Sequence, residues 1–160
     1  MVTALELSPE AFLFLVDRAL DGMVRILNTL GDDLVNERPD LEGANSPYGI
    51  VTHCVGLTRW WSGEVAAGGT VPRDRESEFP TTGKVADLVA EVPAARQAVA
   101  DAVAAGDWAG KNRGAVPPAF ADTPIGATRG GVLLHVYEEL AQHLGQLEIT
   151  RDILLAQAGG

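Results

Sequence analysis

The chain has 160 residues, 46% of them hydrophobic and 21% charged, which excludes wholesale disorder and predicts a single domain over residues 1–160. Twelve basic against 22 acidic side chains give a formal net charge of −10, and this charge disfavours binding to nucleic acids or anionic membranes. The acidic N-terminus predicts no leader, and the absence of a long apolar run predicts no spanning helix. A single cysteine excludes an internal disulfide, and together these features predict a cytoplasmic location.

Two amphipathic helices are predicted in the first half of the chain. The first begins with Ser8 as a capping residue and Pro9 at the first helical position, and apolar residues then recur at three- and four-residue steps until Gly31. Ser46 and Pro47 repeat the same start signal after a polar segment, and the second helix should run to the next pair of glycines.

The second half of the chain predicts two more helices. A charged loop at 70–83 precedes a helix over about 84–105, which Pro93 should kink or split because proline lacks the backbone N–H. Segment 106–126 has no hydrophobic period, and a long amphipathic pattern over 129–156 predicts the last helix.

Four amphipathic helices without a strand pattern predict an all-α fold, a four-helix bundle with long connecting loops. The connections at 66–83 and 106–126 are long enough for an arrangement other than simple up-and-down. Segment 106–126 contains four glycines and three prolines. We expect it either to close over a site or to contain a short hairpin, and in both cases Trp108 and Phe120 should tether it to the body.

The three histidines are the most informative residues of the sequence. His53 lies midway along the second helix, whereas His135 and His143 lie on the fourth, each four residues from Glu139 and so on one face with it. Because ~12 Å of helix rise separates His135 from His143, only one of them can share an ion with Glu139. His53 is then the remaining histidine for a third ligand, and Glu138 should be solvated or accept a bond from an imidazole.

Two imidazoles and one carboxylate form a ligand set that suits zinc, with nickel or iron as alternatives, and three protein ligands leave a position open for water or substrate. The spacing also fits a site without metal, because a chain of this composition contains about one such histidine–acid pair by chance. In that alternative, Glu139 and His143 form a surface pair and His53 is a satisfied core residue.

The resemblance to a known family rests on two segments. Residues 135–152 read HVYEELAQHLGQLEITRD, and they resemble the last helix of the DinB-like superfamily. Their EExxxHxGQ pattern is similar to the branch of mycothiol-dependent maleylpyruvate isomerase N-terminal domains and mycothiol S-transferases. Residues 46–61 read SPYGIVTHCVGLTRWW and resemble the second helix of that branch. The resemblance implies a divalent metal, usually zinc, between these two helices, with His53, Glu139 and His143 as ligands.

The sequence departs from the family pattern in two respects. The commoner DinB-like pattern has a histidine where this chain has Glu139, although the mycothiol branch accepts glutamate. The isomerases also carry an additional C-terminal domain that supplies an active-site arginine, and we expect none after Gly160. The resemblance therefore favours thiol transfer over isomerisation.

The expected function is that of a zinc-dependent thiol S-transferase with a role in detoxification. The metal would activate a low-molecular-weight thiol such as mycothiol for attack on an electrophilic small molecule, with Glu139 and His143 as catalytic metal ligands. The alternative is a non-catalytic module that binds metal or a partner and serves regulation or stress response. Related bundles are frequently dimers, so a homodimer is compatible with the sequence, although no apolar seam demands one.

Four further residues lie close in sequence to the predicted metal ligands. Trp60 and Arg59 are expected to line the mouth of a pocket for the thiol, and Gln146 is expected to face the metal pocket. Cys54 is predicted to be a small buried apolar residue rather than a catalytic thiolate, because no basic residue flanks it closely.

Overall fold

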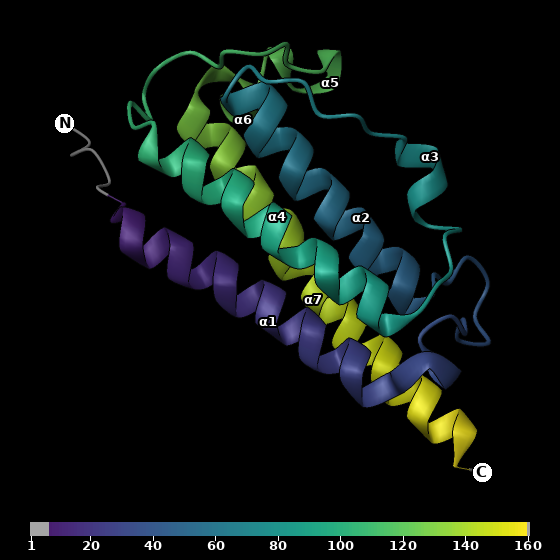
Figure 1. Ribbon diagram of the computed structural model, residues 1–160. Helices are drawn as coiled ribbons and strands as arrows, with labels where there is room; N and C mark the ends of the chain where they lie inside the picture. Colours follow the sequence, from purple (N-terminus) through teal and green to yellow (C-terminus); the bar gives the residue numbers. More distant parts are fainter. Residues whose placement is uncertain (1–6, 160) are drawn as a thin grey trace, which may run out of the picture.

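The computed structural model describes residues 7–159, and four long helices form a bundle (Figure 1). The predicted all-α fold is confirmed, since the described residues contain no strand. The first six residues, where no leader is expected, and Gly160 lie outside the described part. The long helices are α1 (Pro9–Leu34), α2 (Pro47–Trp60), α4 (Val85–Ala104) and α7 (Arg129–Ala158).

The bundle is not a simple up-and-down arrangement. Helices α1 and α2 each pack against both α4 and α7, so α1 and α2 lie on a diagonal. The connection at 67–84 runs back along α2, and α4 therefore runs parallel to α2 (Figure 1). The backbone N–H of Val85 donates to Asp32 Oδ1 at 2.8 Å and fixes the start of α4 to the end of α1.

The predicted helix starts are confirmed by their caps. Ser8 Oγ accepts from the N–H of Ala11, and Ser46 Oγ accepts from the N–H of Gly49. Gly31 does not end α1 as predicted. Its φ of 63° interrupts the helix, which then continues for one more turn to Leu34.

Pro93 was expected to kink or split the third helix, and a split is excluded because α4 is continuous through it. Pro93 lies on the exposed face of α4. Water can therefore hydrate the carbonyl group that loses its backbone partner, and the ring points away from the neighbouring helices.

Three short helices lie in the connections, and one π-helical segment extends α2. They are η1 (Trp61–Ala66), α3 (Arg75–Glu78), α5 (Pro118–Ala121) and α6 (Pro124–Ala127). Segment 106–126 thus contains helical turns and not the hairpin that was one of two expectations. Its predicted tethers are confirmed: the ring of Trp108 meets Phe12 edge-on at 5.3 Å, and that of Phe120 meets Trp61 at 5.2 Å.

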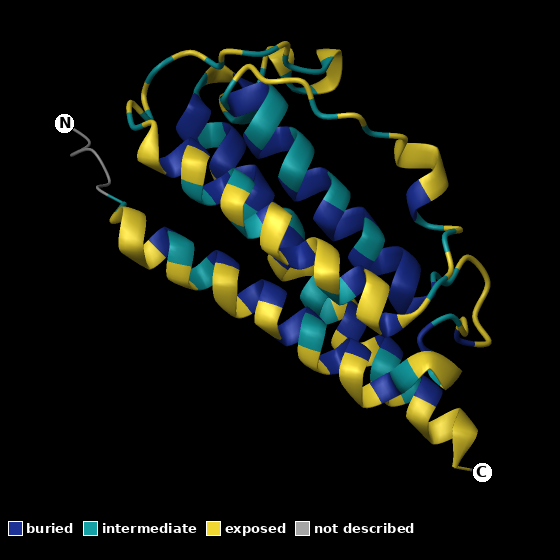
Figure 2. Ribbon diagram, viewed as in Figure 1, coloured by how far each residue is buried: buried dark blue, intermediate teal, exposed yellow. Residues whose placement is uncertain are grey.

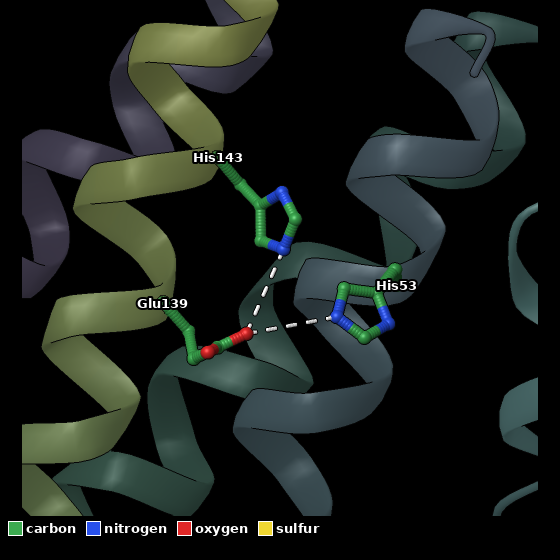
Figure 3. Close-up of side chains that lie close together, drawn as sticks. All are labelled: His53, Glu139 and His143. Carbon is green, nitrogen blue, oxygen red and sulfur yellow. Dashed lines mark ion pairs between the residues drawn. The ribbon is translucent and has the colours of Figure 1, made fainter. Parts of the chain in front are cut away.

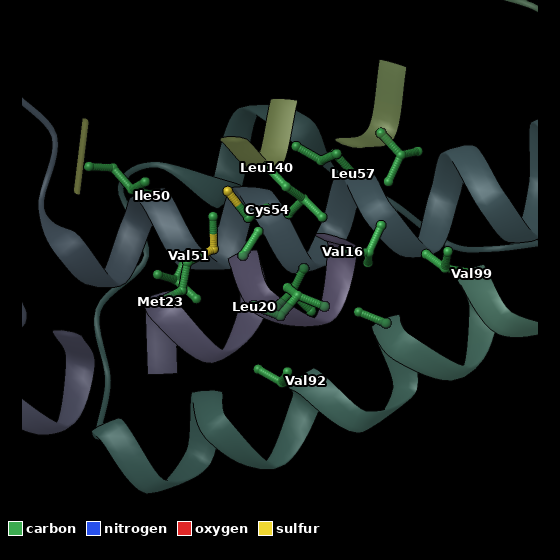
Figure 4. Close-up of a cluster of buried hydrophobic side chains, with 14 of the residues drawn as sticks. Val16, Leu20, Met23, Ile50, Val51, Cys54, Leu57, Val92, Val99 and Leu140 are labelled. Atoms are coloured by element: carbon green, nitrogen blue, oxygen red, sulfur yellow. The ribbon is translucent and has the colours of Figure 1, made fainter. Parts of the chain in front are cut away.

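The core runs along the whole bundle, where the inward faces of the helices are buried and their outward faces are exposed (Figure 2). Cys54 is fully buried within it beside other apolar side chains of α1, α2, α4 and α7 (Figure 4). Among the described residues, no helix is long and apolar enough to cross a membrane. The packing of α2 against α7 is what brings the histidines of these helices together.

Candidate metal centre

The structure brings the three predicted ligands to one point between α2 and α7 (Figure 3). Glu139 Oε2 lies 3.8 Å from His53 Nε2 and 3.6 Å from His143 Nε2, and one donor atom of each residue lies within 4.8 Å of the others. A tetrahedral zinc ion with bonds of ~2.1 Å holds its donors about 3.4 Å apart. The three residues therefore fit a divalent cation with only small side-chain adjustments.

The second nitrogen of each imidazole is already engaged on the side away from this point. His53 Nδ1 lies 2.7 Å from Glu78 Oε2, and His143 Nδ1 lies 2.9 Å from Gln146 Oε1. Because both oxygens accept, each Nδ1 carries a proton, and in the neutral imidazoles the Nε2 lone pairs that a metal ion would need face Glu139. Such outer partners fix the tautomer and ring orientation of metal-binding histidines.

Glu78 is itself held firmly. Arg73 donates to it twice, from Nε to Oε1 at 2.7 Å and from a terminal nitrogen to Oε2 at 2.9 Å. The ring of Phe79 stacks on that of His53 with centroids 4.5 Å apart. Residues 73–79, which we call the strap, thus orient His53 from outside the bundle.

Two glycines of α2 allow the strap to lie this close. A Cβ at Gly56 would fall inside contact distance of Glu78 Oε1, and one at Gly49 would fall inside contact distance of the backbone oxygen of Phe79. No prediction from the sequence included the strap. The signal that could have found it is the pair of glycines four residues before and three after His53.

The electrostatics of the centre favour a positive charge. The neighbouring imidazoles of His143 and His53 hold the pKa of Glu139 far below its usual range. Burial lowers the pKa of His53, but the nearby carboxylates of Glu139 and Glu78 outweigh it and the net shift is upward. The pKa of Glu78 is likewise lowered, because His53 and Arg73 outweigh its burial. The cluster therefore stabilises a cation at its centre, whether a proton or a metal ion.

A cavity of about 500 Å³ opens beside His53 and Glu139. Trp60 lies on its wall, as expected of a pocket residue, and the neighbouring Trp61 lines it too. The cavity lies under the cover formed by α5 and beside the strap. The remaining lining residues are Leu57, Arg73, Arg75, Pro117, Ala119, Phe120 and His135.

Two residues predicted to contact the thiol lie elsewhere. Arg59 donates to Glu91 of α4 at 3.2 Å and does not line the cavity, so the structure gives no support for a contact with a bound thiol. Gln146 is exposed and reaches the centre only through His143, whose Nδ1 it engages. Gln146 can therefore orient the ring of His143, a candidate metal ligand.

The remaining candidates are also placed. His135 is buried on the cavity wall and pairs through Nδ1 with Glu138 at 3.1 Å, so Glu138 is an acceptor for an imidazole outside the ligand set. Burial raises the pKa of Cys54 well above the usual thiol value. A reactive thiolate at Cys54 is therefore disfavoured.

Fold and site together define a DinB-like helical bundle with a candidate metal centre beside a cavity. A family model described as mycothiol-S-transferase matches residues 11–155. The chain therefore belongs to the mycothiol S-transferase family. No curated protein gives a match to the chain.

Proposed function

We propose that the protein is a metal-dependent mycothiol S-transferase that joins mycothiol to an electrophilic small molecule. His53, Glu139 and His143 would hold the metal, most simply zinc. The observation that carries the proposal is their convergence at the edge of a cavity of about 500 Å³ in a chain of this family. A purely structural ion would not need such a cavity beside it.

A bound divalent cation would supply Lewis acidity, lowering the pKa of a thiol so that its thiolate form is present at neutral pH. Three protein donors leave room for one further ligand. Glu139 and the two imidazoles provide only one negative charge, which leaves the centre attractive to an anionic sulfur. In the transfer, a carbon–sulfur bond forms, the leaving group departs with its electron pair, and the thiol proton passes to solvent.

The chain supplies the binding surface for the electrophile rather than a nucleophile of its own. Trp60, Trp61 and Phe120 give the cavity an aromatic wall that excludes water and orients an apolar substrate. Cys54 is buried in the core and lies outside this wall. Conjugation of reactive electrophiles in this way would serve detoxification.

The test measures zinc content and thiol conjugation together. Both should be lost in His143→Ala and in Glu139→Gln, while Glu148→Gln, which changes an exposed glutamate of the same helix, should retain both. Circular dichroism checks that each variant is folded. Full zinc stoichiometry in the two ligand variants would refute the assignment of the metal site. A zinc-loaded protein that consumes no thiol across a panel of electrophiles would instead favour a non-catalytic metal-binding module.

A further inference from the structure

The charge distribution around the cavity distinguishes two arginines of the strap. Both Arg73 and Arg75 line the cavity, but their surroundings differ. The guanidinium of Arg73 is already engaged, since it makes both bonds to Glu78 and its carbon lies 5.8 Å from the ring centroid of Trp60. The exposed side chain of Arg75 has neither an ion pair nor a hydrogen bond among residues 7–159, although the acidic residues Asp74 and Glu76 flank it.

We propose that the cavity takes an electrophile with an aromatic or other apolar body and an anionic group, most simply a carboxylate, and that Arg75 binds this anion. The inference rests on the proposed function and names the substrate class of the same site. It assigns Arg75 a part in substrate recognition that is separate from the metal ligands.

The apolar part of the substrate follows from the composition of the wall. Its apolar lining residues favour a flat apolar ring over a polar chain; they are Leu57, Trp60, Trp61, Pro117, Ala119 and Phe120. The ring of Trp61 meets that of Phe120 edge-on, so the wall is a packed aromatic surface. An aromatic body of this kind gains free energy from burial there, but it has no charge of its own to set its orientation.

The anionic group of the substrate is inferred from Arg75, a cationic side chain of the cavity without an ion-pair partner among the described residues. The protein carries a formal net charge of −10, so an anion is repelled at long range and needs a local positive group to bind. Glu139 lies at the metal end of the cavity, whereas Arg75 lies on the strap. A guanidinium binds a carboxylate through two parallel hydrogen bonds, which fixes the direction of the bound molecule. With its anion at Arg75, the reactive carbon of the substrate faces the centre formed by His53, Glu139 and His143.

The first experiment compares two electrophiles that differ only in charge, para-(chloromethyl)benzoate and para-(chloromethyl)benzamide. In each reaction mycothiol sulfur forms a bond to the benzylic carbon, the carbon–chlorine bond breaks, chloride leaves with the electron pair, and the thiol proton passes to solvent. Rates are corrected for the uncatalysed reaction. We expect the zinc-loaded wild-type protein to prefer the benzoate in kcat/KM. The ratio of benzoate to benzamide should fall about 3- to 10-fold in Arg75→Gln and largely return in Arg75→Lys.

The matched control is Arg38→Gln, which removes an exposed arginine of the connection after α1 that does not line the cavity. It lowers the net charge by the same amount and should leave the ratio unchanged. A similar fall in Arg38→Gln would show that the preference reflects overall charge and would overturn the assignment to Arg75.

The second experiment measures binding without turnover. Para-nitrobenzoate and para-nitrobenzamide quench tryptophan fluorescence, and Trp60 and Trp61 line the cavity. The titration is made with zinc-loaded protein and after chelation, because a carboxylate also binds zinc directly. After chelation, the wild-type protein should still bind the benzoate more tightly than the benzamide, and Arg75→Gln should lose about 3- to 10-fold of this preference.

The outcomes separate the two proposals. Conjugation of both electrophiles with the same ratio in wild-type protein and Arg75→Gln, together with unchanged quenching, overturns the role of Arg75 and leaves the transferase function standing. Loss of preference in quenching without any conjugation of either electrophile supports anion binding at Arg75 but refutes the proposed transferase activity.

Discussion

Replacing Gly56 by alanine should weaken zinc binding without unfolding the protein. The new Cβ would lie 3.1 Å from Glu78 Cδ and closer still to Oε1. To reach an ordinary carbon–oxygen separation of about 3.3 Å, the carboxylate must retreat by roughly 1 Å. Its bonds to His53 and Arg73 are both 2.7 Å long, and hydrogen bonds fail beyond about 3.2 Å, so at least one of them is lost.

The expected loss is about 10- to 100-fold in zinc affinity, the usual cost of removing an outer partner of a metal-binding histidine. Glu78→Gln should give a loss in the same range, because an amide holds the imidazole less strongly than a carboxylate does. Gly56→Ala should lose only about 0.5–2 kcal/mol of stability and stay folded. Alanine gains up to about 1 kcal/mol of helix propensity, which offsets part of the roughly 1.5–3 kcal/mol for a lost hydrogen bond to a charged group.

The assay is competition for zinc with a chromogenic chelator, alongside thermal unfolding of the metal-free protein. Gly145→Ala is the matched control, because it replaces a glycine of α7 whose Cβ would meet nothing within 4 Å. It should gain up to about 1 kcal/mol in stability and keep its zinc affinity. Unchanged zinc affinity in both Gly56→Ala and Glu78→Gln would refute the role of the strap.

Three further predictions follow from single residues. Zinc affinity should fall as pH decreases, and the fall should begin above the usual histidine range because the raised pKa of His53 lets protons compete with zinc there. Zinc titrations at stepped pH check this, and an affinity that stays flat between pH 8 and 6 (roughly the span over which free imidazole titrates) would contradict it. Cys54→Ser should retain thiol transfer but lose about 1–3 kcal/mol of unfolding free energy through a buried hydroxyl, and loss of activity in folded protein would make the thiol functional. Gly31→Ala should lose about 1–2 kcal/mol in denaturant unfolding, since its φ of 63° strains any other residue, and an unchanged midpoint would contradict that.

The long helices could be predicted because their start signals and apolar periods are local. Ser8 and Ser46 cap the helices that they were expected to cap. The outcomes at Gly31 and Pro93 could not be predicted, since each depends on packing or on exposure in the folded bundle. The π-helical segment that begins at Trp61 also has no periodic signal, because π-helical turns are rare and are set by tertiary contacts.

The convergence of His53, Glu139 and His143 could be predicted because histidine is rare in this chain and the spacing on α7 is helical. Their outer partners were harder to foresee. Arg73 and Glu78 lie in a loop of mixed charge, where sequence does not distinguish a buried pair from a solvated one. Arg59 was expected in the cavity because it precedes Trp60, but adjacent residues on a helix diverge by about 100°, and this turn carries Arg59 toward α4.

The strap serves both the candidate metal centre and the cavity. Glu78 holds His53, a candidate metal ligand, while Arg75, three residues earlier, lines the cavity. Because α3 is only one helical turn long, a change in its length or angle moves both groups together. The core helices should be little affected, since α3 contacts mainly the outer face of α2, beside the glycines that admit the strap. Insertion or deletion of a residue within 73–79 should therefore alter substrate choice and metal affinity together, whereas substitutions in the α5 cover should alter substrate choice alone.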